Sequence, residues 1–394
     1  MTDSTTTSAP APADASGAEP QDGPRRTALH PVHAELGASF TDFGGWDMPL
    51  KYGSELAEHQ AVREAAGLFD ISHMGEIRVR GPQAAAFLNY ALVGNLAVMK
   101  VGKAKYTMIV EPGGGIIDDL IVYRRGEQDY LVVANAGNAP TVYAELRERV
   151  GGAGTAFDVD VVDESAETSM IAVQGPAAEG ILLGLVPAEQ AETVTGMKYY
   201  AADAVTVAGT EVLLARTGYT GEDGFELYVP NDGAVDLWRT LLEAGEPAGL
   251  IPAGLAARDS LRLEAGMPLY GNELTRQTTP IDAGLGAIVS FKKEDDFVGR
   301  AALEAAREAG TARRLVGLKG LGRRAGRTGY PVLKDGAEVG VVTSGQPSPT
   351  LGYPVVMAYV DAEHAEPGTA LDVDLRGKPQ PFEVVALPFY QRQK

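Results

Sequence analysis

Two adjacent aspartates, Asp118 and Asp119, lie inside the apolar run GGGIIDDLIVYR, residues 113–124. The run predicts a β-strand, in which successive side chains point to opposite faces. Strict alternation gives two faces, which comprise Asp118 with Ile116, Leu120 and Val122, and Asp119 with Ile117, Ile121 and Tyr123. Because both faces are apolar, at least one carboxylate is expected in hydrophobic surroundings. Such a position is costly unless the group is paired, hydrogen-bonded or used in chemistry.

Two glycine-containing stretches carry large side chains that could wall a binding pocket. FGGWDMPLKYGS, residues 43–54, places Trp46, Met48 and Tyr52 on a loop. These side chains either line a pocket or fill the core beneath the loop, and residue type favours the core. FDISHMGEI, residues 69–77, contains a histidine beside Met74. A lone histidine in such a place is more often a satisfied, partly buried residue than a ligand-binding one.

Two later stretches carry charged side chains near apolar positions. In RTGYTGEDGFELYVP, residues 216–230, Glu226 alternates with apolar residues at the start of a strand, whereas Glu222 and Asp223 are typical of exposed turn acids. An inward carboxylate suits a guanidine-like ligand edge, and a solvated strand acid is the equal alternative. On the helix within AARDSLRLEAGMPLYGNEL, residues 256–274, an aspartate and an arginine three residues apart should pair. Arg258 is then left for a ligand or another carboxylate.

Composition narrows the classes of function. The chain has 394 residues and a formal net charge of -19, which disfavours nucleic-acid binding. It contains no cysteine, so thiolate metal sites and a catalytic thiol are excluded, and a cytoplasmic protein is the simplest expectation. The five histidines form no metal-binding motif, so no metal is expected. No apolar run is long enough to cross a membrane, and no phosphate-binding or dinucleotide-binding glycine motif is present.

The order of patterns predicts an α+β protein with a separate β-domain at its C-terminus. Residues 1–26 read as a disordered tail, because they are rich in Ala, Pro, Ser and Thr. Residues 27–165 and 166–290 alternate helical and strand patterns, with a helix expected over 54–70 and an antiparallel meander over 103–135. A linker helix over 291–312 precedes a β-barrel or sandwich over 313–394, which has an Asp335-Gly336 hairpin signal.

An ordered set of motifs resembles the glycine-cleavage T-protein, or aminomethyltransferase, family. The motifs are FGGWDMPLKYG, FDISHMGEI, GGIIDDLIV, IAVQGP, GYTGEDGFEL, ARDSLRLEAGMPLYGNEL and TSGQPSPTLG. The resemblance runs from about residue 29 to 390 and implies a three-domain, folate-binding α+β fold with a C-terminal all-β barrel. It also implies transfer of an aminomethyl group from the dihydrolipoyl arm of the H-protein to tetrahydrofolate, which gives methylenetetrahydrofolate, ammonia and reduced H-protein.

The same resemblance assigns roles to particular residues. The family's catalytic aspartate falls on Asp119, which would polarise the bridging nitrogen of folate while an iminium forms as the thiol departs. A buried carboxylate suits proton exchange and stabilisation of a cation. The family's pterin-binding glutamate and the arginine on the following helix fall on Glu226 and Arg258. The remaining residues implied for the folate pocket are Asn135, Met74, Tyr106 and Tyr390.

The resemblance also implies partners, and it leaves two rival functions open. Lipoylated H-protein is the direct partner, and the glycine decarboxylase P-protein and dihydrolipoyl dehydrogenase are indirect ones. Six basic residues at the start of the final region could attract the H-protein or the glutamate tail of folate, or form a solvated loop. They are Arg313, Arg314, Lys319, Arg323, Arg324 and Arg327. The rivals are the folate-dependent half of a sarcosine or dimethylglycine dehydrogenase, and a folate-binding module for iron–sulfur assembly or RNA modification.

Overall fold

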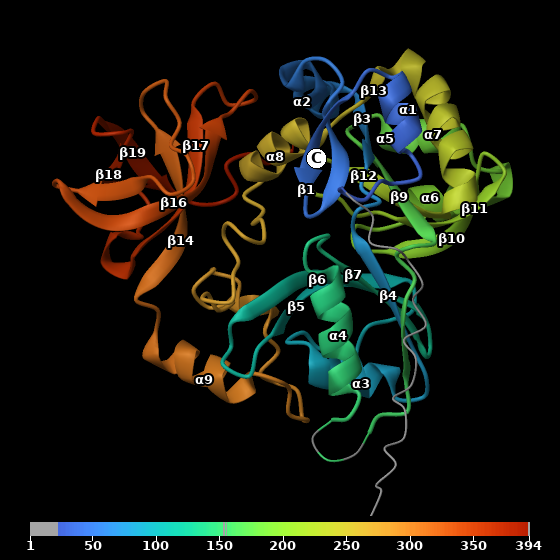
Figure 1. The fold of residues 1–394 in the computed structure, drawn as a ribbon, viewed down its shortest axis with the longest axis horizontal. Helices are drawn as coiled ribbons and strands as arrows, with labels where there is room; N and C mark the ends of the chain where they lie inside the picture. The colour runs from blue at the N-terminus through green and yellow to red at the C-terminus, as the bar shows by residue number, and fades with distance from the viewer. Residues whose placement is uncertain (1–22, 153, 155, 393–394) are drawn as a thin grey trace, which may run out of the picture.

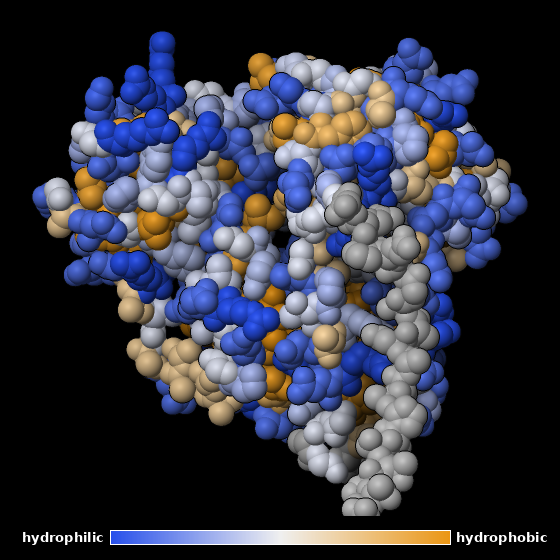
Figure 2. All heavy atoms as spheres, in the orientation of Figure 1, coloured by the Kyte–Doolittle hydropathy of each residue, from blue (hydrophilic) through white to orange (hydrophobic). Residues whose placement is uncertain are grey.

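The computed structural model describes residues 23–152, 154 and 156–392. In these ranges the strands form a five-stranded sheet, a six-stranded sheet, a closed six-stranded barrel and a small hairpin. Figure 1 shows the sheets and the barrel as three lobes around a common centre, with the barrel in orange and red at the left. The face seen in Figure 2 is mostly hydrophilic, and its hydrophobic residues gather only in small groups. The α+β fold with a C-terminal all-β barrel confirms the fold class expected from the sequence.

The five-stranded sheet has the order β5-β6-β7-β4-β8, and all its strand pairs are antiparallel. The predicted meander is confirmed as β5, β6 and β7. Two helices supply apolar side chains to the core of this lobe. The elements are β4 (Gly75–Arg80), α3 (Ala84–Ala91), β5 (Lys103–Val110), β6 (Ile116–Gly126), β7 (Asp129–Ala134), α4 (Ala139–Arg149) and β8 (Asp160–Asp163).

A β-bulge changes the faces that strict alternation assigns near the two aspartates. The register between β5 and β6 shifts between Ile109 and Val110, so that Ile109 lies opposite Asp118 while Val110 lies opposite Ile116. Ile117 is the extra residue, and its side chain packs in the same core cluster as Leu120. The prediction that Ile117 shares a face with Asp119 is therefore wrong, because a bulge places two consecutive residues opposite one partner residue.

The six-stranded sheet has the order β10-β11-β12-β9-β3-β13, and only the β13–β3 pair is parallel. Helix α7 covers it and buries Trp238 completely in the core of this lobe. The elements are α1 (His30–Glu35), α2 (Glu55–Glu64), β3 (Ala66–Asp70), β9 (Thr168–Gln174), α5 (Ala178–Leu183), α6 (Ala191–Gly196), β10 (Ala202–Val207), β11 (Thr210–Ala215), β12 (Gly224–Pro230), α7 (Asn231–Gly245), β13 (Leu250–Pro252) and α8 (Leu255–Glu264).

The helix expected over 54–70 is shorter than the sequence pattern suggests. Ser54 caps it at the N-terminus, because its side chain accepts a hydrogen bond from the Ala57 N–H. Helix α2 ends at Glu64, and the next five residues form β3 in the centre of the sheet. Gly67, within β3, allows close packing, since a Cβ there would lie 2.5 Å from a methyl group of Val62. Pairing with β9 and β13 thus outweighs the local helical pattern.

The barrel closes in the order β14-β17-β16-β15-β18-β19 and encloses its own apolar core. The predicted hairpin is confirmed, because Asp335 and Gly336 both have positive φ between β15 and β16. Helix α9 (Arg300–Ala309) leads into the barrel. The strands are β14 (Arg313–Gly320), β15 (Pro331–Lys334), β16 (Ala337–Pro347), β17 (Pro354–Asp361), β18 (Ala370–Asp374) and β19 (Pro379–Val385).

The N-terminal region joins the fold before residue 27. The predicted tail over 1–26 lies outside the described residues up to residue 22. Arg25 is part of the fold, since its N–H and carbonyl bond to Gly45 and Asp47 at 2.8 Å, beside the hairpin of β1 (Ser39–Phe43) and β2 (Trp46–Lys51). The boundaries at 165, 290 and 312 stay predictions. A division at 165 does not separate the two sheets, because β3 pairs with β9.

Candidate active site

A cavity of about 320 Å³ lies where the inner faces of the two sheets meet helix α8. Six of the seven residues expected at the folate site line it. They are Asp119, Glu226, Arg258, Asn135, Met74 and Tyr106. The seventh, Tyr390, is not among the lining residues, and its ring lies 4.1 Å from the guanidinium of Arg63 instead. The structure therefore brings together residues from four separate stretches of the sequence.

The two aspartates of β6 point to opposite sides of the sheet. Asp119 lines the cavity, whereas Asp118 is fully buried beneath it. One Asp119 oxygen accepts a hydrogen bond from the Tyr106 hydroxyl at 2.9 Å, and the other accepts one from the Asn135 side-chain amide at 2.9 Å. A carboxylate held by two neutral donors keeps its charge and a fixed orientation toward the cavity.

Asp118 acts as the support for this arrangement. Its carboxyl accepts hydrogen bonds from the Asn135 backbone N–H and side-chain amide, both at 2.9 Å. The Asn138 side-chain amide donates a third at 2.8 Å. Because the same Asn135 amide also donates to Asp119, Asp118 fixes the residue that orients the cavity carboxylate. The double aspartate thus combines a carboxylate in the cavity with a second that positions it.

Burial raises the pKa of both aspartates. The pKa of Asp119 rises to about 6, because desolvation outweighs the hydrogen bonds from Tyr106 and Asn135. Desolvation and then the charge of Asp119 raise the pKa of Asp118, despite its bonds from Asn138 and Asn135. The two carboxyl groups share Asn135 and titrate as a pair, so both retain protons to higher pH than exposed aspartates do.

Glu226 enters the cavity from β12 on the opposite sheet. Thr217 Oγ1 donates to its Oε2 at 2.5 Å, and the Tyr123 hydroxyl donates to the same atom at 3.3 Å. Both of these bonds use one oxygen, so Oε1 can accept from a ligand. Burial raises its pKa, and the bond from Thr217 and the charge of Arg258 act in the other direction. The cavity alternative is therefore favoured over the solvated strand acid.

Arg258 projects from helix α8 into the same cavity, and its guanidinium lies 4.8 Å from the centre of the Tyr219 ring. The expected pair of Asp259 and Arg262 forms at 2.8 Å, which leaves Arg258 for the cavity as predicted. Burial lowers the pKa of Arg258, and the negative charge of Glu226 raises it. The cavity thus contains a cation between two carboxylate-bearing sheets.

Apolar and aromatic side chains complete the walls, and sequence reasoning missed several of them. Tyr200, Tyr219 and the segment 267–269 line the cavity. Tyr219 and 267–269 belong to motifs quoted above, so position within a motif was the available signal. His73 also lines the cavity and is 2% exposed, and burial followed by the charge of Arg258 lowers its pKa to about 3. It is neutral at physiological pH.

The large side chains of residues 43–54 lie mainly in the core, as their residue types predict. Met48 is fully buried, and the Tyr52 hydroxyl lies 2.8 Å from Nδ1 of His33. Phe43, at the start of the stretch, is its one residue among the cavity lining. The interpretation of these large side chains as pocket walls therefore fails for Met48 and Tyr52, which pack and bond beneath the loop.

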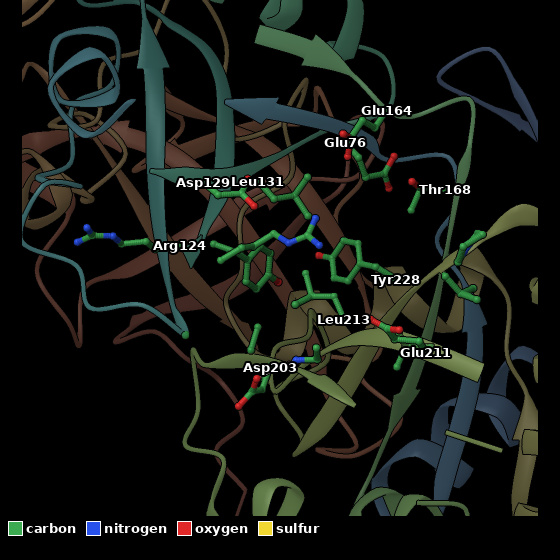
Figure 3. Close-up of a pocket in the computed structure, with 18 of the residues that line it drawn as sticks. Glu76, Arg124, Asp129, Leu131, Glu164, Thr168, Asp203, Glu211, Leu213 and Tyr228 are labelled. Atoms are coloured by element: carbon green, nitrogen blue, oxygen red, sulfur yellow. Dashed lines mark hydrogen bonds between the residues drawn. The ribbon is translucent and has the colours of Figure 1, made fainter. Parts of the chain in front are cut away.

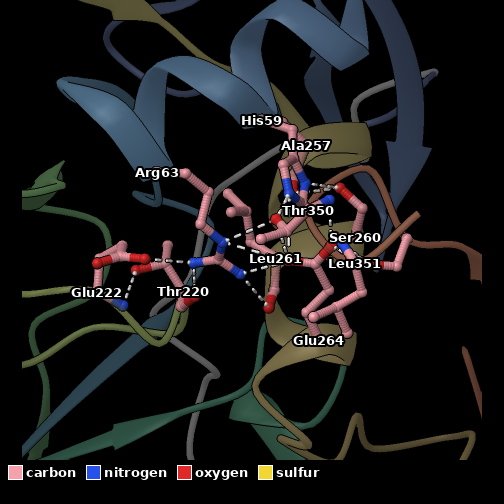
Figure 4. A network of polar contacts seen from close by, with 11 residues as sticks. His59, Arg63, Thr220, Glu222, Ala257, Ser260, Leu261, Glu264, Thr350 and Leu351 are labelled. Carbon is pink, nitrogen blue, oxygen red and sulfur yellow. Dashed lines mark hydrogen bonds and ion pairs between the residues drawn. The ribbon is translucent and has the colours of Figure 1, made fainter. Parts of the chain in front are cut away.

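A buried polar network holds the loop of residues 218–224 that carries Tyr219. Figure 4 shows Arg63 of α2 between Glu222 and Thr220 on one side and Glu264 and Thr350 on the other. Its Nη1 donates to the Thr220 carbonyl at 2.7 Å and to Glu222 at 2.9 Å, and its Nη2 donates to Glu264 at 2.8 Å. The prediction that Glu222 is an exposed turn acid is wrong, because it is 9% exposed and paired with this arginine.

Asp223, the second predicted turn acid, is also ion-paired. It contacts Arg216 at 2.5 Å and Arg392 at 3.2 Å. The bond from Arg216 and then that from Arg392 lower its pKa, although burial opposes this. The loop is therefore held by Arg216, which is 7 residues before Asp223, and by Arg392 and Arg63 from distant parts of the chain.

The basic residues at the start of the barrel do not form one free cluster. Arg313 pairs with Asp361 at 3.2 Å, and Arg314 lies 3.9 Å from Glu366. Lys319 lies over the ring of Tyr353. Arg323 and Arg324 remain exposed. A role for these two in attracting an acidic partner stays a prediction.

Within the described ranges, no group of three or more His, Asp or Glu residues is arranged to hold a metal ion. No helix of the described chain is both long and apolar enough to cross a membrane.

Comparison with known proteins identifies the family. The model of the GCVT N-terminal domain matches residues 29–293, and that of the glycine cleavage T-protein C-terminal barrel domain matches 313–391. An aminomethyltransferase of Streptomyces avermitilis is 62% identical over 375 residues, which is 94% of this chain and 99% of the relative. One of Bacillus subtilis is 44% identical over 369 residues, which cover 93% and 99%.

The crystal structure of glycine cleavage system aminomethyltransferase T from Bartonella henselae superposes with a TM-score of 0.85. The two are 39% identical, and the match covers 93% of this chain and 98% of that one. The chain belongs to the glycine cleavage T-protein family, and it is an aminomethyltransferase. Near full-length identity to aminomethyltransferases supports this enzyme over a dehydrogenase half or a non-catalytic binding module.

Proposed function

We propose that the cavity binds tetrahydrofolate as co-substrate and that the lipoyl arm of the H-protein delivers the aminomethyl group to it. The C–S bond of the aminomethyl thioether and the bond from the same carbon to its amino nitrogen both break, while the carbon forms bonds to two folate nitrogens. The two protons that these nitrogens lose leave with the thiol and the ammonia. The products are methylenetetrahydrofolate, ammonia and the free dihydrolipoyl thiol. Folate supplies the nitrogen atoms that take up the carbon, while the protein supplies binding groups and charge. The observation that carries the proposal is the convergence of Asp119, Glu226 and Arg258 on one cavity.

The side chains in the cavity fit a pterin. Oε1 of Glu226 can accept from an N–H edge, because the bonds from Thr217 and Tyr123 go to Oε2. The aromatic ring of Tyr219 and the apolar side chain of Met74 can contact the faces of a pterin ring. Arg258 can attract an anionic or carbonyl group. Asp119 can accept an N–H hydrogen bond or proton from the reacting part of the ligand and can stabilise positive charge there.

The direct test is formation of methylenetetrahydrofolate from aminomethylated, lipoylated H-protein and tetrahydrofolate. Turnover that depends on both reactants is expected. Binding of folate without any transfer would contradict the proposal, and so would equal transfer from free aminomethyl dihydrolipoamide and from the H-protein. The second result would specifically remove the H-protein as the required partner.

Replacement of Glu226 by glutamine should mainly weaken folate binding. The substitution removes the charge of an acceptor buried beside the ligand, which costs about 1.5–3 kcal/mol, or roughly 10- to 150-fold in KM for tetrahydrofolate. The value of kcat should change less. Steady-state kinetics with varied folate measures both constants. Glu243→Gln on the exposed side of α7 is the matched control. A fall in kcat with constant KM would contradict a binding role.

Activity should fall as the pH drops through the pKa of Asp119. That pKa is raised to about 6, so the carboxylate is ionised above this pH and protonated below it. The protonated form cannot accept a proton or stabilise a cation. In Tyr106→Phe, loss of a hydrogen bond that lowers the pKa should move the acid limb of kcat to higher pH. If the acid limb of the kcat profile lay at the same pH in this variant as in the wild type, the pH dependence would not come from Asp119.

A further inference from the structure

A second and larger cavity, of about 770 Å³, lies between the same two sheets (Figure 3). It is farther along the strands that form the folate cavity, with Tyr123 and Leu131 in place of Ile121 and Val133. The ring of Tyr228 lines both cavities and lies edge-on to Tyr123, with ring centres 5.6 Å apart. The function described above makes no use of this second cavity.

Two buried polar groups that line the second cavity lack partners. Glu76 of β4 is 1% exposed, and neither of its carboxyl oxygens has a hydrogen-bond partner among the described residues. Tyr228 of β12 is 6% exposed, and its hydroxyl has no partner in the described chain either. Figure 3 shows the two side chains reaching the cavity from different sheets. Buried polar groups nearly always have a hydrogen-bond partner. Because Glu76 and Tyr228 both lack one, the two groups point to a bound ligand.

The charges around the cavity favour a cation. Six acids and two arginines line it, and they are Glu76, Asp129, Glu164, Glu167, Asp203, Glu211, Arg124 and Arg125. Asp129 and Glu164 are paired with Arg78. Arg124 is paired with Glu127 and bonded to the carbonyl of Met99, and Arg125 is exposed. Glu76 is the most deeply buried of the six acids, and its carboxyl group is not paired with any arginine or lysine of the described residues.

We propose that this cavity binds an organic amine through its primary ammonium group, which donates hydrogen bonds to the Glu76 carboxylate and the Tyr228 hydroxyl. A primary ammonium group has three N–H donors and no acceptor, which matches two acceptor groups from opposite sheets. The volume suits an organic molecule rather than a bare ion. A metal ion is disfavoured, since the described residues contain no cluster of three suitable ligands.

The protonation of Glu76 gives the proposal a second readout. Burial, followed by the negative charge of Asp163 and then that of Glu164, raises the pKa of this carboxyl well above its usual range. The groups that face it are these two acids, near β8, and Tyr228. The raised pKa favours the protonated carboxyl when no ligand is bound. An ammonium group favours the ionised carboxylate instead, so binding and proton release are coupled.

The test is calorimetric titration of the full-length protein with butylammonium chloride at pH 7, in two buffers of different ionisation enthalpy. Saturable binding with release of up to about one proton is expected from the displaced proton. Glu76→Gln should bind at least about tenfold more weakly, because a charge-assisted bond is lost. Tyr228→Phe, which loses only the hydroxyl, should weaken binding about three- to tenfold. Glu243→Gln, an exposed acid on α7 that does not line the cavity, is the control and should bind like the wild type.

Tetramethylammonium chloride at equal ionic strength tests the need for N–H donors and should not bind. Equal binding of this cation, equal binding by Glu76→Gln, or no saturable heat with butylammonium would each overturn the proposal. If Glu76→Gln does not fold, proton release by the wild type and the weaker binding of Tyr228→Phe decide the question. None of these measurements requires folate or H-protein, so failure here leaves the transferase function unaffected.

Discussion

Replacement of Asp119 by asparagine should reduce kcat by about 10² to 10⁴, the range typical of losing a positioned acid–base group. The substitution keeps the size of the side chain and one acceptor oxygen for Asn135 or Tyr106. It removes the negative charge that the cavity presents and the ability to accept a proton. Because Glu226 and Arg258 are unchanged, folate should still bind, and the loss should appear in kcat rather than in KM.

The matched comparison is Asp118→Asn, one residue earlier on the same strand. Asp118 lies outside the cavity lining and reaches the cavity only through Asn135. We expect a loss of stability of about 1–3 kcal/mol, because one of its buried hydrogen bonds is replaced by a donor facing a donor. Its kcat should fall far less than that of Asp119→Asn. Folate binding by equilibrium titration and methylenetetrahydrofolate formation measure the two effects. A larger fall of kcat in Asp118→Asn would contradict the assigned roles.

Much of the site could be predicted because local chemistry is visible in the sequence. Two acids in an apolar strand indicate that at least one carboxylate is buried and that hydrogen bonds, an ion pair or a catalytic role must compensate for its burial. Their separation onto opposite faces also follows from strand geometry. The sequence could not give the bulge at Ile117, because a bulge depends on the register with β5. It also could not give the hydrogen bond from Asn135 to both carboxyl groups, which comes from the next strand.

Features that depend on distant partners were missed for a common physical reason. The segment 66–70 follows a helix without a break in the pattern, and only its neighbours β9 and β13 make it a strand. Glu222 has the sequence context of a turn acid, and its partner is 159 residues away. Glu76 alternates with apolar residues in a short strand, and only the opposing sheet shows that it is buried. Burial of a charge is a property of packing between elements and is weakly encoded in any one of them.

Replacement of Arg63 by alanine should be among the most destabilising single changes to a charged residue in this protein. The Arg63 side chain is 6% exposed, and the side chains of its partners Glu222 and Glu264 are 5% and 0% exposed. Glu264 also lies 3.2 Å from His59 and accepts from Thr350 at 2.7 Å. Burial alone would raise the pKa of Glu264, yet bonds from His59, Ser348 and Thr350 lower it to about 2. It is therefore ionised at neutral pH and keeps its buried charge when the arginine is removed.

Removal of one partner from a buried ion pair costs about 3–5 kcal/mol, whereas an exposed pair is worth about 0–1 kcal/mol. Arg239→Ala is the matched control, since Arg239 pairs with Glu35 at 2.7 Å but both side chains are more than half exposed. Denaturant unfolding followed by the fluorescence of buried Trp238 compares the two variants. Arg63→Ala should also raise KM for folate more than it lowers kcat, because Arg63 holds the loop that carries Tyr219 through the Thr220 carbonyl. If both variants unfolded at the same denaturant concentration, the network would not be what fixes helix α2, this loop and the barrel together.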